Sequence, residues 1–409
     1  MTQSGPGEVP SPERSGGLRR GLPALGAALS LIVIFIAVLA IPLTTAADLG
    51  LSAGETTAWI IAIYGLPGAV SLVLAWRYRQ PLLLTGNIFV LILIARLGTD
   101  FAWPELVGAT MVAGAVVLVL GPLGFTNWLA AWLPAPIVFG LLAGAVLPFF
   151  VDMFTELGNE PLLVGGTLLV YLVERRTLEP RIPAILPALV AGLVLAGVSG
   201  EFGGVSVNLA FPAPTLTAPE FSLSAILTVT PVMIVLITVQ ANVPSIVFLR
   251  EQDYQPPEKT ITGVSGVGTV AGSLLGPTGI SLSLPATALC AGPDAGDHSI
   301  RHWSVYIAAS AAVAIAVLAG IAVELAAVVP RALLVTGVGL AVVGVLAGAL
   351  QRVTRGPLIW GPLFAFAIAL SDLSLLGLGS FFWAIAGGLG VSLLLERHQW
   401  KTLQGEQAM

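Results

Sequence analysis

Apolar runs of about twenty residues recur along the chain, and this recurrence limits its fold more than any other feature. A helix needs about twenty such residues to cross the hydrocarbon core of a bilayer. Charge is correspondingly scarce, because 10% of the 409 residues are charged, whereas a soluble domain averages about 25%. So few charges cannot cover a surface that faces water. We therefore expect an all-α polytopic membrane protein with a lipid bilayer around it.

Fourteen apolar segments can be distinguished, seven on each side of a polar stretch at 200–221. The first seven are expected near 24–47, 56–76, 82–98, 104–121, 135–152, 161–173 and 182–199. The other seven are expected near 222–249, 259–275, 279–292, 303–323, 331–350, 357–371 and 374–395. The domains expected from this division are a first repeat over 24–199, an extracytoplasmic loop over 200–221, and a second repeat over 222–396.

Two terminal stretches, 1–23 and 397–409, are expected to lie in the cytoplasm. The first is rich in Pro, Gly and Ser and is expected to be disordered. The short amphipathic piece at 125–133 is expected to lie on the membrane surface.

The basic residues predict the orientation of the chain. When the N-terminus is placed in the cytoplasm and the segments alternate, 15 of the 17 Lys and Arg residues fall in cytoplasmic connections. Only Arg96 and Arg331 fall towards the outside. Cytoplasmic loops of membrane proteins carry the excess of basic residues. The sequence therefore predicts a multi-pass protein of the inner (plasma) membrane with both termini in the cytoplasm.

The two halves of the chain resemble each other. LPAPIVFGLLAGAVL (133–147) aligns with VPRALLVTGVGLAVV (329–343), which places Pro134 over Pro330 at a displacement of 330 minus 134, or 196, residues. An odd number of crossings in each half makes the two repeats inverted. In inverted repeats, substrate sites lie near the bilayer midplane, where discontinuous helices begin.

The third and tenth segments are expected to be broken in this way. Each leaves too few residues for a helix that spans the bilayer, so we predict a short extended stretch followed by a half-helix. The N–H groups of the two half-helices would then form an anion site. The candidate residues are Thr85, Gly86 and Asn87 in one segment and Gly279, Ile280, Ser281 and Ser283 in the other. The alternative is that these small residues only permit close helix packing.

Gln240 and Asn242 lie deep in the eighth segment and are the remaining candidates for substrate contact. Their alternative role is to hold helices together by hydrogen bonds. No cluster of His, Asp or Glu falls within the segments, and there is one cysteine, Cys290. We therefore expect no enzyme activity, no cofactor, no metal ion and no nucleic-acid partner. Four prolines interrupt segments, and each is expected to kink or end a helix: Pro42, Pro67, Pro148 and Pro244.

The stretch QANVPSIVFLREQDYQPP (240–257), together with the tenth segment and ALCAGPDAG (288–296), resembles the bacterial benzoate transporter family of proton symporters. The resemblance covers nearly all of residues 24–396. It implies the fold of the uracil/xanthine and sulfate permeases, in which a core domain (segments 1–4 and 8–11) carries substrate against a gate domain (5–7 and 12–14). Homodimers are common in that fold, so the resemblance leaves a homodimer open.

The chain departs from the family at the expected site. The Gly-Gly-His-Ala-Ile-Asn-like string usual at the tenth break is replaced by a stretch around Gly279 that has neither His nor Asn. The resemblance implies proton symport of a small organic anion, benzoate or a similar aromatic carboxylate. Two alternatives stay open: a sulfate- or bicarbonate-like inorganic anion carrier, and a passive anion channel of the same fold.

Overall fold

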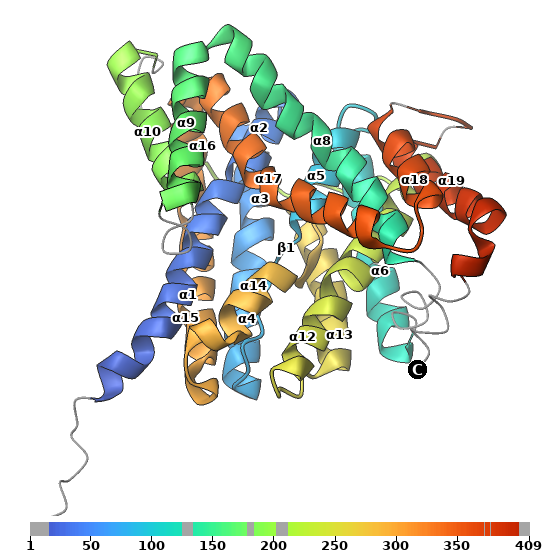
Figure 1. Cartoon of the computed structure of the whole chain (residues 1–409), viewed down its shortest axis with the longest axis horizontal. Coiled ribbons are helices and arrows are strands. Elements are labelled where there is room, and N and C mark those ends of the chain that lie inside the picture. Colours follow the sequence, from blue (N-terminus) through green and yellow to red (C-terminus); the bar gives the residue numbers. More distant parts are fainter. Residues whose placement is uncertain are drawn as a thin grey trace, which may run out of the picture.

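The computed structural model describes residues 16–124, 134–177, 184–201, 212–371, 373–376 and 378–400, and these form a bundle of helices around two short strands (Figure 1). The first half contains α1 (Gly16–Val38), α2 (Ala40–Asp48), α3 (Ala53–Ile60), η1 (Ile61–Gly65), α4 (Leu66–Tyr78), β1 (Leu84–Gly86), α5 (Ile88–Leu97), α6 (Trp103–Leu120), η2 (Gly121–Leu123), α8 (Ala135–Asn159), α9 (Pro161–Thr177) and α10 (Ile185–Ser199). The second half contains α11 (Leu223–Val235), η3 (Leu236–Asn242), α12 (Val243–Glu251), α13 (Glu258–Ser273), β2 (Ile280–Leu282), α14 (Leu284–Ala291), η4 (Pro293–Ala295), η5 (His298–Ile300), α15 (His302–Val317), α16 (Ala319–Val328), α17 (Arg331–Arg355), α18 (Trp360–Leu370) and α19 (Ser380–Leu395).

Every apolar segment expected from the sequence contains a helix. Within the described residues, six helical stretches are long and apolar enough to cross a membrane: Leu22–Asp48, Ala53–Tyr78, Ala135–Asn159, Leu223–Glu251, His298–Val317 and Arg331–Arg355. The first helix begins at Gly16, inside the N-terminal stretch expected to be disordered. The surface piece expected at 125–133 lies outside the described residues, as do 1–15 and 401–409.

The helix boundaries follow the displacement of 196 residues found in the sequence. Moving α8 (Ala135–Asn159) by 196 positions gives the bounds of α17 (Arg331–Arg355) at both ends. Pro134 and Pro330 precede these two helices, as the alignment placed them. The same displacement moves the start of α5 at Ile88 onto the start of α14 at Leu284.

The extended stretches expected in the third and tenth segments are confirmed, and they pair with each other. Strands β1 and β2 form an antiparallel ladder in which Thr85 lies opposite Ser281. The half-helices α5 and α14 follow directly. Close packing requires a glycine at 86, because a Cβ there would lie 2.8 Å from the Ile63 carbonyl oxygen.

Two helices change to π-helix just before a proline, with one residue in between. The π-helix η1 precedes Pro67, and η3 precedes Pro244. Proline has no N–H to donate to the preceding turn, and the ladder of hydrogen bonds adjusts by widening. At two of the four prolines singled out in the sequence the helix therefore widens to a π-turn, a feature often found at functional sites. Pro148 instead lies inside α8, which continues from Ala135 to Asn159 without a break.

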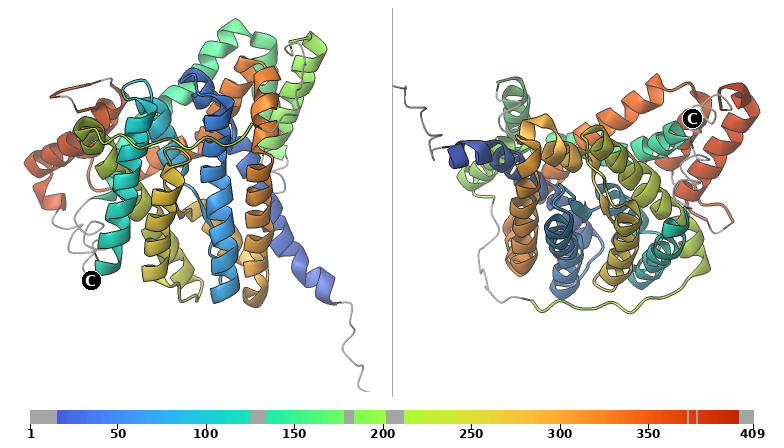
Figure 2. Two further views of the ribbon diagram at one scale, coloured as in Figure 1. Left: turned by 180° about the vertical axis from the view of Figure 1, so that it is seen from behind. Right: turned by 90° about the horizontal axis from the view of Figure 1, so that it is seen from below.

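The closest helix packing involves a few pairs. α6 packs against α11 and α13, and α15 packs against α1 and α4. α8 packs against α17 and α18, α18 against α19, and α9 against α10. α11 also packs against α19, and α17 against α2. Residues 212–222 run as an extended chain across the bundle (Figure 2). Their backbone N–H groups bond to Gly54, Pro104 and Leu274, so the ends of α3, α6 and α13 lie at one side of the molecule.

Candidate functional site

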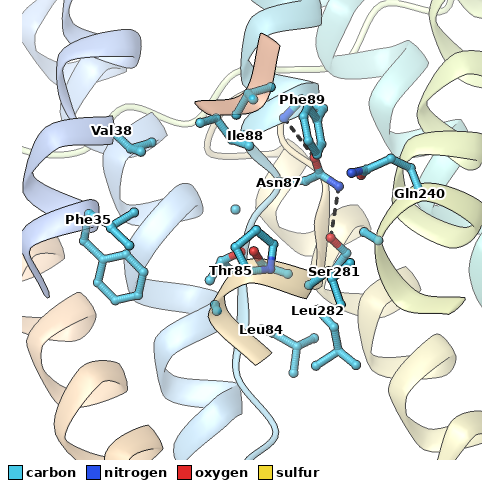
Figure 3. Close-up of a pocket in the computed structure, with 18 of the residues that line it drawn as sticks. Phe35, Val38, Leu84, Thr85, Asn87, Ile88, Phe89, Gln240, Ser281 and Leu282 are labelled. Carbon is cyan, nitrogen blue, oxygen red and sulfur yellow. Dashed lines mark hydrogen bonds between the residues drawn. The ribbon is translucent and has the colours of Figure 1, made fainter. Parts of the chain in front are cut away.

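A cavity of about 520 Å³ lies beside the paired strands (Figure 3). One wall is formed by β1, β2 and the starts of α5 and α14, and other walls come from α1, α8 and α17. The lining is mainly apolar and includes the rings of Phe35, Tyr64, Phe89 and Phe139. The cavity therefore lies between the paired strands with their half-helices and the helices α1, α8 and α17, and it can accommodate an aromatic ring.

Six of the residues proposed from the sequence line this cavity: Thr85, Gly86, Asn87, Gln240, Ser281 and Ser283. They come from β1, β2, η3 and the residues that begin the two half-helices, which are far apart in the sequence. Asn242, Gly279 and Ile280 are not part of the lining.

The Asn87 side chain joins both strands and the eighth segment. Its Oδ1 accepts hydrogen bonds from the N–H groups of Phe89 at 2.9 Å and Val90 at 3.4 Å, which caps α5. Its Nδ2 donates to Ser281 Oγ at 3.0 Å and to the Leu236 carbonyl at 3.2 Å. Asn87 is buried, and its amide is fully occupied by these partners. It therefore fixes the geometry of the cavity wall.

Asn242 holds the outer edge of β2 from behind the cavity. Its Oδ1 accepts from the Leu282 N–H at 2.9 Å, and its Nδ2 donates to Ser265 Oγ at 3.1 Å. Thr269 Oγ1 accepts in the same way from Ile280 N–H. Inside a bilayer every backbone polar group needs a partner within the protein. The buried Asn242 thus supplies what a third strand would supply in a sheet.

Gln240 differs from Asn242, although it lies two positions away in the same π-helix. It lines the cavity, and Figure 3 shows its side chain directed from η3 towards Asn87. Its Oε1 is buried and has no hydrogen-bond partner among the described residues. Leaving a buried acceptor without a donor costs about 1–3 kcal/mol. A ligand in the cavity could supply the missing donor.

The two half-helices begin differently. The N-terminus of α5 is capped by Asn87, whereas Ser283 at the start of α14 makes no side-chain cap hydrogen bond. Ser283 lines the cavity, and the first N–H groups of a helix carry partial positive charge. Of the two N-termini expected to form the anion site, only that of α14 is without a side-chain cap.

Sequence reasoning missed the charge and the aromatic wall of the cavity. Among the described residues that line it, Arg352 is the one charged side chain, and no Asp, Glu or His is present. The alternation of segments from a cytoplasmic N-terminus places Arg352 in a cytoplasmic connection, which does not predict that it lines a cavity. The seven-residue spacing of Val345 and Arg352 could have indicated a shared helix face, since residues seven apart align on a helix.

Comparison with known proteins supports a single family. A sequence model of the family described as benzoate membrane transport protein matches residues 21–394. The benzoate membrane transport protein of Acinetobacter baylyi is 27% identical over 81% of this chain and 84% of its own length. The Escherichia coli inner membrane protein YdcO is 26% identical over 82% of this chain and 88% of its own length.

Solved structures share the fold at low sequence identity. The transmembrane domain of the cyanobacterial bicarbonate transporter BicA has a TM-score of 0.54 and 17% identity, covering 92% of this chain and 97% of that domain. The murine Solute Carrier 26 family member A9 anion transporter has a TM-score of 0.62 and 12% identity, covering 95% of this chain and 70% of its own. At these identities the likeness concerns the fold alone.

Proposed function

Because the chain belongs to the benzoate membrane transport protein family, we propose that it is a secondary active transporter of a small organic anion, benzoate or a similar aromatic carboxylate, coupled to protons by symport. As a member of that family it is a multi-pass membrane transport protein and not an enzyme.

The observation that carries the substrate class is the composition of the cavity wall. Four aromatic rings and many aliphatic side chains line it, together with one cationic and no anionic side chain among the described residues. Apolar walls with few convergent polar groups are typical of sites for small organic molecules. In the proposed complex the ring lies against the aromatic side chains, and the carboxyl group faces Gln240, Ser283 and the start of α14.

The proposed topology has fourteen crossings, arranged as two inverted repeats of seven, with both termini in the cytoplasm. The strand register supports this proposal. A displacement of 196 residues takes Leu84 to Ile280 and Gly86 to Leu282, and the observed pairs are Leu84 with Leu282 and Gly86 with Ile280. Exchange of the two repeats therefore reproduces the same ladder. This is expected when a two-fold axis in the membrane plane relates them.

The proposed transport movement is a displacement of one group of helices relative to the other. Segments 1–4 and 8–11 would form the core domain that carries the substrate, and segments 5–7 and 12–14 the gate domain. The lining of the cavity supports this division, since it includes β1 and β2 from the proposed core domain and α8 and α17 from the proposed gate domain. Alternate exposure of a site between two such bodies is how inverted-repeat transporters work.

The coupled proton is proposed to travel on the carboxyl group of the substrate. No Asp, Glu or His lines the cavity within the described residues, so no side chain there titrates near neutral pH. The Gln240 Oε1 supports this route, because it is a buried acceptor without a partner. A protonated carboxyl group has an O–H to donate, and the Gln amide can return an N–H to its carbonyl oxygen.

The test is uptake of labelled benzoate into proteoliposomes of the purified full-length protein, with and without an inward proton gradient. Accumulation that requires the gradient, and that Gln240→Ala reduces at least tenfold, is the expected result. Uptake of bicarbonate or sulfate without uptake of benzoate would instead identify an inorganic anion carrier. Flux far above about 10³ per second would identify a channel, because carriers reorient slowly in each cycle.

A further inference from the structure

Arg352 occupies a special position in the cavity. It lies in the last turn of α17 and is solvent-exposed, whereas most of the residues that line the cavity with it are buried or half-buried. A lining residue that also reaches solvent lies at the rim. Arg352 is thus where a ligand coming from this side first meets a charge.

No carboxylate among the described residues neutralises the charge of Arg352. Its guanidinium carbon lies 4.5 Å from the centre of the Phe139 ring, and no ion pair of Arg352 is found within the described residues. Phe139 is itself buried in the cavity wall, so this contact holds the cation against the cavity. A cation–π contact at an exposed site contributes about 0.5–1 kcal/mol. Charge-assisted bonds from a guanidinium to a carboxylate are stronger.

If Arg352 only stabilised the end of its helix, the neighbouring Arg355 would have the same role. Basic side chains in the last turn of a helix interact favourably with the helix dipole. Arg352 and Arg355 both lie in the last turn of α17, and both are exposed. Arg355 does not line the cavity. The comparison of these two residues therefore separates a role in the cavity from a role in the helix.

We propose that Arg352 is a specificity-determining residue that binds the carboxylate of the substrate at the rim of the cavity, next to the ring of Phe139. The inference rests on the proposed function and deepens it, since it names an anionic aromatic ligand and the side chain that selects its charge. The guanidinium binds the carboxylate through two parallel N–H donors, a geometry that an ammonium group does not reproduce. The substrate then passes to the inner part of the cavity, where Gln240 and Ser283 lie.

The experiment measures equilibrium binding of labelled benzoate to the purified full-length protein at low and high salt. Arg352→Gln is expected to weaken binding about tenfold at low salt, a moderate effect because the group is exposed and partly screened. It should also remove most of the salt dependence seen in the unmodified protein. The affinity of Arg352→Lys for benzoate should lie between that of the unmodified protein and that of Arg352→Gln. Phe139→Leu should weaken benzoate binding more than bicarbonate binding.

Arg355→Gln is the matched control and should bind benzoate as the unmodified protein does, with the same salt dependence. Circular dichroism and gel filtration of each variant verify the fold. Equal weakening by both glutamine variants, or none by Arg352→Gln, would overturn the role of Arg352 and leave the proposed function intact. If the unmodified protein binds bicarbonate but no aromatic carboxylate, the proposed substrate is wrong and the inference fails with it.

Discussion

Gln240 and Asn242 are amide side chains two positions apart in η3, and they have different roles. Asn242 is fully buried, and both ends of its amide are bonded, to Leu282 and Ser265. Gln240 lines the cavity, and its Oε1 has no hydrogen-bond partner in the described part of the chain. The hydrogen-bond partners, and not the residue type, therefore separate a positioning residue from a candidate ligand-binding residue.

A pair of alanine variants tests this difference at the residue scale. Asn242→Ala leaves the Leu282 N–H buried without an acceptor, which should cost about 1–3 kcal/mol of stability. We expect a clearly lower melting temperature in detergent, together with loss of transport. Gln240→Ala breaks no side-chain hydrogen bond among the described residues and should weaken transport without lowering the melting temperature. Equal melting temperatures for the two variants would contradict the assignment.

At the scale of elements, the junction of α18 and α19 depends on one carboxylate. Glu396, directly after α19, accepts hydrogen bonds from the N–H groups of Ile359, Trp360 and Gly361 and from the Ser392 hydroxyl. Burial alone would raise the pKa of this carboxyl group, but these bonds outweigh burial and hold the pKa below its ordinary value. The Glu396 carboxylate thus links the end of α19 to the start of α18 by hydrogen bonds.

The lowered pKa of Glu396 predicts how stability changes with pH. A carboxyl group with a depressed folded-state pKa stabilises the fold above its unfolded pKa of about 4.3, and this contribution is lost as pH falls through the folded value. Glu396→Gln should therefore lower stability by about 1.5–3 kcal/mol at neutral pH, the range for hydrogen bonds to charged groups. Thermal unfolding of the variant and of the unmodified protein at pH 7 and at pH 3 measures this loss of stability. The difference between variant and unmodified protein should shrink at the lower pH, and a constant difference would argue against the charge.

At the scale of the whole molecule, the cavity is lined by elements from both halves of the chain and has no protonatable carboxylate or imidazole in its described lining. If the substrate carries the proton, the pH dependence of uptake must follow the substrate. Ring-substituted benzoates of different acidity should then give uptake profiles that shift with the pKa of each compound. A profile that stays fixed for all of them would instead point to a titrating protein side chain.

Local sequence determined the positions of the helices and of their breaks. Hydrophobic length sets where a chain can be helical in a bilayer, and runs such as 135–152 and 331–350 carry that signal without any reference to the rest of the fold. Prolines and glycines mark the interruptions, because a missing N–H or a missing Cβ acts on the adjacent turn. For this reason the extended stretches near Thr85 and Ser281 could be predicted from sequence and are confirmed as paired strands.

The roles of individual side chains were decided by the tertiary structure. Nothing local distinguishes Asn242, which bonds the edge of β2, from Gln240, which faces the cavity. Nor does the sequence near Arg352 show that its guanidinium lies over Phe139, a residue more than two hundred positions away. Hydrogen-bond partners and cavity walls are formed by segments that meet only when the chain has folded. Sequence therefore determined where the backbone is helical or broken, and long-range packing decided which polar groups remain available to a ligand.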